Sequence, residues 1–211
     1  MYKRQSLWTL IIVSPLLAVI SIILLVHTRK SPFFFQTRVG YRGKLFRVFK
    51  FKTLTDARDS EGLLLPDDLR SFPLGTFLRR YSLDELPQLV NIIKGDMSIV
   101  GPRPWIPEQL DVFPGRCRMA RCSVRPGLTG MAQVYGRNGI PFYRRVCYDI
   151  VYARNVSLFM DARIVFQTVV RLLAHKDVRQ CEDAFRNISG SMLIRNDLSV
   201  PVPFPSKQEE S

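Results

Sequence analysis

Cysteine, histidine and the common nucleotide-binding motifs are scarce in this sequence of 211 residues. It contains four cysteines and two histidines and has no CxxC pair, so neither a zinc site nor the disulfide framework of a small secreted protein is indicated. A Walker A motif and a GxGxxG motif are both absent, so ATP-binding and dinucleotide-binding folds lack support. We expect the thiols to be reduced and mostly buried.

Acidic residues are absent from residues 1–55, which hold ten basic residues. The remainder has 21 basic and 18 acidic residues, so most of the formal charge of +13 lies in the first quarter of the chain. A protein that coats nucleic acid would continue its positive charge through the folded part, so no nucleic-acid partner is expected. The length suits one domain, with room for a membrane element.

A run of 22 residues without a charge extends over residues 5–26. At about 1.5 Å per residue, a helix of this length covers roughly 33 Å, which is enough to cross a bilayer. Pro15 removes one backbone hydrogen bond and crowds the carbonyl of Ile11, so the helix should bend at Ser14 and Pro15. The hydroxyl of Ser14 could bond a carbonyl that is freed at this bend.

Basic residues flank both ends of the apolar run, and lysine and arginine favour the cytoplasmic side of a membrane. A bent, re-entrant helix agrees with both flanks, since each arm is about half as long as a hydrocarbon core is thick. A kinked helix that spans the bilayer is equally compatible, because membrane helices tolerate proline. A cleaved signal peptide is disfavoured, because the run is long and no small-x-small site follows it.

The pattern of the remaining chain predicts an α+β fold that is mostly helical. Ser157 is a candidate cap for the last helix, and Leu158–Leu173 is amphipathic enough to lie on a membrane or to pack in a core. The expected segments are a strand at 45–54, a surface excursion at 55–75, helices at 76–94, irregular loops at 95–141 and helices at 142–174 with a break near Asn155.

Two adjacent carboxylates, Asp84 and Glu85, begin a predicted helix. Ser82 and Glu85 have the spacing of a capping box, which would give them a purely structural role. Alternatively the two acids divide a chemical task, because neighbouring helical side chains point about 100° apart. One carboxylate could attack phosphorus or hold a metal while the other moves protons, and Arg79 just before them would attract an anion.

Arginines among glycines and prolines form a second group, Arg103 in GPRP, Arg125 in RPGLTG and Arg137 in GRN. Arginine binds phosphate oxygens through two parallel hydrogen bonds, and glycines let backbone amides approach an anion. These arginines could equally bond loop carbonyls or face water. Asp149 and Asp161, in the last helical region, are also compatible with helix capping or ion pairing.

The run SLDELPQLVNIIKGDMSIVGPRP, residues 82–104, resembles the signature of the bacterial monotopic polyprenyl-phosphate phosphoglycosyl transferases, sugar transferases that begin glycan assembly on a lipid carrier. The segments FQTRVGYRGKLFRVFKFKT, RPGLTGMAQVYGRN and YDIVYARNVSLFMDARI are similar to further motifs of that family, in the same order. The resemblance covers roughly residues 3–174. The chain is similar to the small forms of the family, which act on UDP-linked sugars.

The resemblance implies a re-entrant membrane helix with basic flanks at residues 1–30, broken at Ser14 and Pro15. It implies a small catalytic domain at residues 31–175, with amphipathic interfacial helices, at the cytoplasmic face of the bacterial inner membrane. Residues 176–211 match nothing in the family and are assigned to a C-terminal tail. The implied partners are a UDP-sugar, polyprenyl phosphate, one leaflet of the membrane and downstream glycosyltransferases.

The resemblance also implies a two-step exchange that depends on Mg²⁺. Asp84 would attack the β-phosphate of the UDP-sugar and displace UMP, and polyprenyl phosphate would then attack the phosphosugar-enzyme. Glu85 would assist proton handling, and Asp84 would contribute to the magnesium site. Further family positions with expected roles in substrate binding are Lys50, Arg79, Arg103, Arg125, Arg137, Asp149 and Asp161.

Some residues depart from the family pattern. An aspartate expected near Leu7 is absent, and Met131 stands where the family has the tryptophan of TGWAQ. The competing hypothesis is a membrane-tethered protein that binds anionic lipid through its basic segment and has no catalytic activity. The sequence does not specify the sugar.

Overall fold

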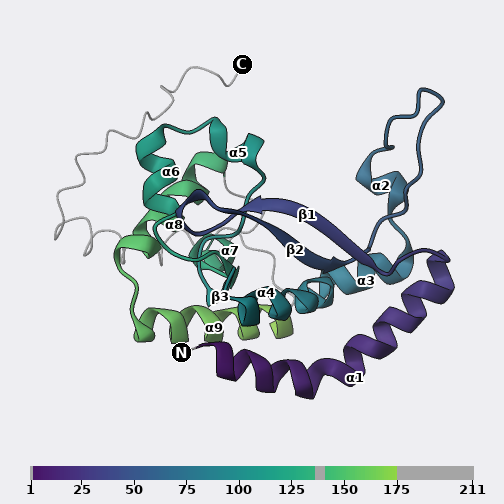
Figure 1. Ribbon diagram of the computed structural model, residues 1–211, viewed down its shortest axis with the longest axis horizontal. Helices are drawn as coiled ribbons and strands as arrows, with labels where there is room; N and C mark the ends of the chain where they lie inside the picture. The colour runs from purple at the N-terminus through teal and green to yellow at the C-terminus, as the bar shows by residue number, and fades with distance from the viewer. Residues whose placement is uncertain (1, 136–140, 175–211) are drawn as a thin grey trace. The chain divides into compact units, whose positions relative to one another are not determined.

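The computed structural model describes residues 2–135 and 141–174 (Figure 1). In these residues helices predominate, and two separate two-stranded sheets are present, so the expected α+β class is confirmed. The expected tail at 176–211 lies outside the described residues and stays a prediction. The elements are α1 (Tyr2–Thr28), β1 (Phe33–Val39), η1 (Tyr41–Gly43), β2 (Leu45–Phe51), α2 (Asp67–Arg70), α3 (Pro73–Arg80), η2 (Leu83–Gln88), α4 (Leu89–Lys94), β3 (Ser98–Val100), α5 (Pro107–Asp111), α6 (Gly115–Arg121), β4 (Gly127–Thr129), α7 (Met131–Tyr135), α8 (Phe142–Arg154) and α9 (Leu158–Ala174).

The long helix α1 continues through Pro15 without interruption. Proline has no amide hydrogen for the carbonyl of Ile11, and Ser14 Oγ donates to that oxygen at 2.8 Å. The predicted repair of the freed carbonyl is therefore confirmed. Figure 1 shows the axis of α1 changing direction part-way along, so the helix is bent rather than broken.

One side of α1 packs against the rest of the domain, and the other side is exposed. Ile20 and Leu24 are buried in a core cluster with Phe51, Phe72 and Leu78. By length and composition, the part of α1 from Leu10 to Thr28 is able to cross a membrane. Its exposed apolar side chains are Ile11, Ile12, Leu16, Val19, Ile22, Ile23, Leu25 and Val26.

The strands β1 and β2 form an antiparallel pair in which Phe34 lies opposite Lys50 and Arg38 opposite Phe46. The sequence did not predict β1, and the strand expected at 45–54 ends earlier, at Phe51. Directly after β2, the backbone at Thr53 packs tightly against α3. A Cβ atom on Gly75 of α3 would lie only 2.3 Å from the carbonyl oxygen of Thr53.

The side chain of Asn91, on α4, pairs with the backbone of β2. Its Oδ1 accepts from the amide of Phe49 at 3.1 Å, and its Nδ2 donates to the carbonyl of Arg47 at 2.8 Å. The amide thus satisfies backbone groups of an edge strand from inside the domain, where Asn91 is 1% exposed. This contact holds α4, and η2 directly before it, beside β2.

The segment expected to be irregular, residues 95–141, contains short regular elements in its described part. The strands β3 and β4 pair in parallel, and α5, α6 and α7 lie in the same segment. A Cβ atom on Gly127 would lie 2.1 Å from the amide nitrogen of Gly101, so only glycine permits this close approach between the start of β4 and the residue after β3. The short elements escaped prediction because each has too few residues to show a period.

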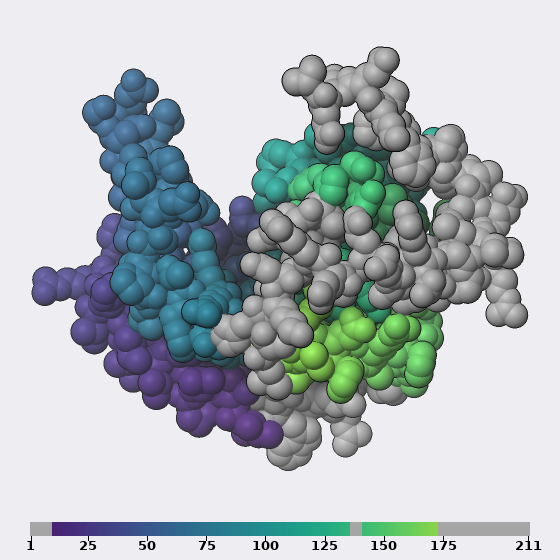
Figure 2. Space-filling model, turned by 180° about the vertical axis from the view of Figure 1, so that it is seen from behind, coloured from purple at the N-terminus to yellow at the C-terminus, as the bar shows by residue number. Residues whose placement is uncertain are grey.

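The helices α8 and α9 confirm the predicted break near Asn155. Ser157 Oγ accepts from the amide of Met160 at 3.2 Å, so the predicted cap of α9 is also confirmed. On α9, Ile164 is buried, whereas Leu158, Phe159, Val165, Phe166, Val169 and Val170 are exposed. Both Figure 1 and, from behind, Figure 2 show α1 and α9 in the lower part of the view, so these two helices, which carry most of the exposed large apolar side chains of the described helices, lie toward one side of the domain.

Candidate active site

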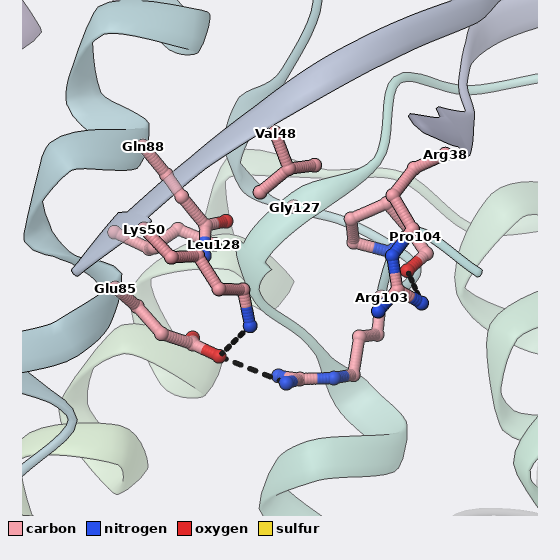
Figure 3. A pocket seen from close by; sticks show the side chains of 9 residues that line it. All are labelled: Arg38, Val48, Lys50, Glu85, Gln88, Arg103, Pro104, Gly127 and Leu128. Atoms are coloured by element: carbon pink, nitrogen blue, oxygen red, sulfur yellow. Dashed lines mark hydrogen bonds and ion pairs between the residues drawn. The ribbon is translucent and has the colours of Figure 1, made fainter. Parts of the chain in front are cut away.

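A small pocket lies where β1, β2, η2 and the loop after β3 meet (Figure 3). Three cationic side chains and one carboxylate line it, so its positive charge exceeds its negative charge and favours an anionic ligand. The lining residues are Arg38, Val48, Lys50, Glu85, Gln88, Arg103, Pro104, Gly127 and Leu128.

Glu85 is the centre of the charged cluster. Its Oε1 atom lies 3.2 Å from Lys50 Nζ and 2.8 Å from Arg103 Nη2, and its side chain is only 13% exposed. Burial acts to raise the pKa of Glu85, but the charges of Arg103 and Lys50 and their hydrogen bonds outweigh burial and hold the pKa below its ordinary value. Glu85 is therefore ionised at neutral pH.

The capping box that the Ser82–Glu85 spacing permits does not form. Ser82 has φ 55° and ψ 24°, a left-handed conformation, and its side chain makes no capping hydrogen bond. The helix that follows is a 3₁₀-helix, η2, and the carboxylate of Glu85 points to the cations rather than to a backbone amide. A non-glycine residue in a left-handed conformation, two positions before a pair of acids, is a feature that clusters at functional sites.

Asp84 is half-buried and differs sharply from its neighbour. Among residues 10–135 and 141–172, whose side chains are described, none donates a hydrogen bond to its carboxylate or forms an ion pair with it. Burial and the negative charge of Glu85 raise the pKa of Asp84, while Lys50, Arg103 and Arg79 act in the opposite direction. The chain thus leaves one carboxylate available for a ligand and uses the other to hold two cations.

The positive charges of Lys50 and Arg79 both act on Asp84. Burial lowers the pKa of Lys50, and the negative charge of Glu85 opposes the effect. Arg79, in the last turn of α3, donates from Nε to Thr53 Oγ1 at 2.8 Å, which fixes the guanidinium close enough for its charge to act on Asp84. The structure therefore brings together Lys50, Arg79, Asp84, Glu85 and Arg103.

One expected arginine, Arg125, is not part of this group. Arg125 donates from Nε to the carbonyl of Gly95 at 2.9 Å, and its guanidinium lies 5.6 Å from the centre of the Tyr41 ring. Arg125 therefore bonds a loop carbonyl, which was the structural alternative to phosphate binding. Arg137 lies outside the described residues, so its expected role stays a prediction.

Asp149 and Asp161 are both buried inside the domain. Asp161 Oδ1 accepts from the hydroxyl of Tyr152 at 2.8 Å and ties α8 to α9. Asp149, 1% exposed, pairs with Arg121 at 2.8 Å, and burial raises its pKa to about 6 although Arg121 acts to lower it. Both acids have partners inside the domain, and their expected role in substrate binding stays a prediction.

The sequence did not indicate that Arg38 and Arg121 belong to or support the site. Arg38 lines the pocket, and its Nη1 donates to the carbonyl of Pro104 at 3.2 Å. The alternation of FFFQTRV would have placed Phe34, Gln36 and Arg38 on one face of a strand, but the aromatic run hid this pattern. Arg121 belongs to α6, in a segment that was expected to be irregular.

The residues present fit a magnesium ion held jointly by protein and substrate. No group of three or more acidic, histidine or cysteine side chains able to cage a metal occurs in the part of the chain that the structure describes. Mg²⁺ commonly takes one or two carboxylates and completes its octahedron with substrate phosphates and water. The carboxylate of Asp84 lies close enough to Lys50 and Arg103 to feel their charge and has no hydrogen-bond or ion-pair partner among the described side chains, so it is a suitable donor for such an arrangement.

Comparison with known proteins identifies the family of the chain. The model of the family described as bacterial sugar transferase matches residues 4–175. The chain belongs to this family. The expected class of enzyme, a phosphoglycosyl transferase, is thereby confirmed, and the match includes α1 as well as all the residues of the charged cluster.

The relatives within the bacterial sugar transferase family differ in length. The uncharacterized sugar transferase EpsL of Bacillus subtilis is 44% identical over 151 residues, which are 71% of this chain and 74% of that protein. The exopolysaccharide production protein ExoY of Rhizobium meliloti is 37% identical, over 76% of this chain and 78% of that protein. The UDP-glucose:undecaprenyl-phosphate glucose-1-phosphate transferase of Klebsiella pneumoniae is 35% identical, over 79% of this chain but 38% of its own length.

Proposed function

We propose that this protein transfers a sugar phosphate from a UDP-sugar to polyprenyl phosphate at a membrane surface, as the first membrane step of glycan assembly. One observation carries the proposal: in the described part of the chain no side chain pairs with Asp84, whereas the adjacent Glu85 holds Lys50 and Arg103 in place. Two neighbouring carboxylates in different environments suit two different roles. The name of the Klebsiella pneumoniae relative describes the same type of donor, acceptor and transferred group.

In the first step Asp84 is the nucleophile. Its carboxylate oxygen forms a bond to the β-phosphorus of the UDP-sugar, the bond from that phosphorus to the bridging oxygen breaks, and UMP leaves with the bridging oxygen. Lys50 and Arg103 lie where they neutralise charge on the phosphates, and Arg38 adds positive charge to the same pocket. A bound Mg²⁺ would neutralise further phosphate charge, with Asp84 as its protein ligand.

In the second step an oxygen of polyprenyl phosphate forms a bond to the same phosphorus, and the bond from phosphorus to Asp84 breaks. The carboxylate of Asp84 is regenerated, and the product is a polyprenyl-diphosphate-sugar. Glu85 stays ionised, because two cations hold its pKa low, and it can accept a proton from an incoming phosphate. Both steps need correct positioning and neutralised charge more than a strong base.

The membrane topology that fits this chemistry is a re-entrant α1 in the cytoplasmic leaflet of the inner membrane, with α9 at the interface. The exposed apolar residues of α1 and α9 support it, and so do the ten basic residues in positions 1–55. Each basic residue near an anionic surface contributes about 1 kcal/mol of attraction. A site anchored in this way would meet both a soluble donor and a lipid phosphate at headgroup level.

Cysteine labelling tests the topology. In a background without the native cysteines, Ser6→Cys and Ser31→Cys should both react with a membrane-impermeant reagent from the cytoplasmic side. In the same background Pro15→Leu should move the two ends toward opposite sides, because a straight apolar helix is long enough to span. Leu16→Ala is the matched control. Labelling of the Pro15-containing protein from opposite sides would exclude the re-entrant model.

The reaction itself is tested by incubating the membrane-bound protein with a panel of UDP-sugars, undecaprenyl phosphate and Mg²⁺. We expect UMP and a lipid-soluble sugar phosphate in equal amounts for at least one donor, and loss of both when EDTA removes the metal. Binding to anionic vesicles without turnover of any donor would instead favour a membrane-tethered lipid-binding protein and would refute the proposal.

A further inference from the structure

The segment Arg103–Trp105 is held at three consecutive carbonyl oxygens, although it belongs to no helix or strand. The oxygen of Arg103 accepts from Arg121 Nη2 in a short hydrogen bond, and the oxygen of Pro104 accepts from Arg38 Nη1 at 3.2 Å. The oxygen of Trp105 accepts from the amide of Val39 at 2.9 Å. The donors come from α6 and β1, two elements far apart in the sequence.

The guanidinium of Arg121 is fixed on three sides. Its Nε donates to Asp149 Oδ2 at 2.8 Å, its Nη2 donates to the carbonyl of Arg103, and its carbon Cζ lies 4.1 Å from the centre of the Trp105 ring. The side chains of Arg121 and Asp149 are 3% and 2% exposed. The second carboxylate oxygen of Asp149, Oδ1, is buried and has no hydrogen-bond partner among the described residues.

A need for stability does not account for this pair. A buried ion pair loses much of its Coulomb attraction to desolvation, and apolar residues of similar volume often serve stability equally well. The unsatisfied Oδ1 adds a further cost. The pair does provide a rigid hydrogen-bond donor to the carbonyl of Arg103. The side chain of Arg103 in turn reaches Glu85.

The side chain of Arg103 needs such support. It is 42% exposed, and it reaches Glu85 Oε1 with a single donor atom, Nη2, at 2.8 Å. A long exposed side chain loses conformational entropy when it is held in one direction, so its pre-organisation depends on where the backbone lies. A displacement of about 1 Å at a reacting group can cost about 100-fold in rate.

We propose that Arg121 and Asp149 form a positioning unit that fixes the backbone of Arg103 so that its guanidinium meets Glu85 and the donor phosphates. The inference rests on the proposed function for its catalytic consequence, whereas its structural part stands independently. Asp149 thereby acts on the site from the core, through Arg121, without touching the substrate.

Kinetics in a double-mutant cycle test the catalytic part. Arg121→Met should lower kcat/KM by up to about 100-fold in the natural sequence and should cause little further loss in an Arg103→Met background, because the two residues act in series. Arg121→Lys should not restore activity. The planar guanidinium of arginine directs separate donors to Asp149 and to the carbonyl of Arg103, and the compact ammonium of lysine does not reproduce this geometry. Arg118→Met is the matched control, because Arg118 is on the same helix and pairs with an exposed acid, Asp111.

Hydrogen–deuterium exchange of the purified full-length protein tests the structural part without any substrate. Arg121→Met and Asp149→Asn should each speed exchange of the amide of Val39, which donates to the carbonyl of Trp105, and leave the rest of β1 and β2 unchanged. Faster exchange throughout the domain, unchanged exchange of the Val39 amide, or additive losses in the double-mutant cycle would each overturn the positioning role. Local exchange changes in a protein that turns over no UDP-sugar would refute the proposed function alone.

Discussion

Replacing Asp84 by asparagine is expected to reduce transfer of the sugar phosphate by at least about 1,000-fold, because a neutral amide cannot serve as the nucleophile. The side chain keeps its size, and no described residue bonds the natural carboxylate, so the fold should be preserved. Release of UMP should fall together with formation of the lipid product, since both follow the same first bond.

A trapping experiment separates this role from simple binding. With a radiolabelled UDP-sugar and no lipid acceptor, the unmodified protein should retain label that hydroxylamine releases, as expected of an acyl phosphate. The Asp84→Asn variant should retain none. The control is Asp68→Asn, which changes an exposed acid on α2 and should label normally. Full turnover by Asp84→Asn, or product formation with no labelled protein at any time, would reject Asp84 as the nucleophile.

The second large effect is expected for Glu85→Gln, with a loss of about 100- to 1,000-fold in kcat/KM. The amide removes the only negative charge that directly pairs Lys50 and Arg103 in the described residues, and two part-buried cations then repel each other. Glu85→Asp keeps the charge but shortens the side chain, so it should retain more activity than Glu85→Gln.

The pH profile gives Glu85→Gln a distinctive signature. Burial lowers the pKa of Lys50, and the negative charge of Glu85 raises it again. Without that charge the pKa of Lys50 falls further, so Lys50 should lose its proton at a lower pH. The alkaline limb of kcat/KM should therefore move to lower pH in Glu85→Gln and stay in place in the control Glu108→Gln, which changes an exposed acid on α5. An unshifted alkaline limb would show that Glu85 does not support the charge of Lys50.

Predictions from the sequence were confirmed where both interacting residues lie within a short stretch of chain. The hydrogen bond from Ser14 to Ile11 could be predicted, because both residues belong to one turn of one helix and Pro15 dictates which carbonyl is free. The break near Asn155 and the cap at Ser157 have equally local causes.

The spacing of Ser82 and Glu85 along the chain did not decide which contact Glu85 makes. Their spacing satisfies a capping box, but the contact that forms is with Lys50 and Arg103, which lie 35 and 18 residues away from Glu85. Two charged partners in a part-buried setting outweigh one bond to a backbone amide. Arg125 also has the residue type of a phosphate ligand, and only the fold shows that a loop carbonyl takes its donor.

The sequence alone determined the apolar run with its basic flanks, the bend at Pro15 and the presence of two adjacent acids among arginines, because composition and short spacings encode these features. Only the tertiary structure decided that Glu85, and not Asp84, is paired with two cations in the described part of the chain, and that Arg121 and Asp149 contact the backbone of Arg103. Each of these depends on which distant segments come into contact, and the electrostatics of a buried group depend on all its neighbours in space. The physical reason is that desolvation and ion pairing act through distance in three dimensions, and spacing along the chain does not record that distance.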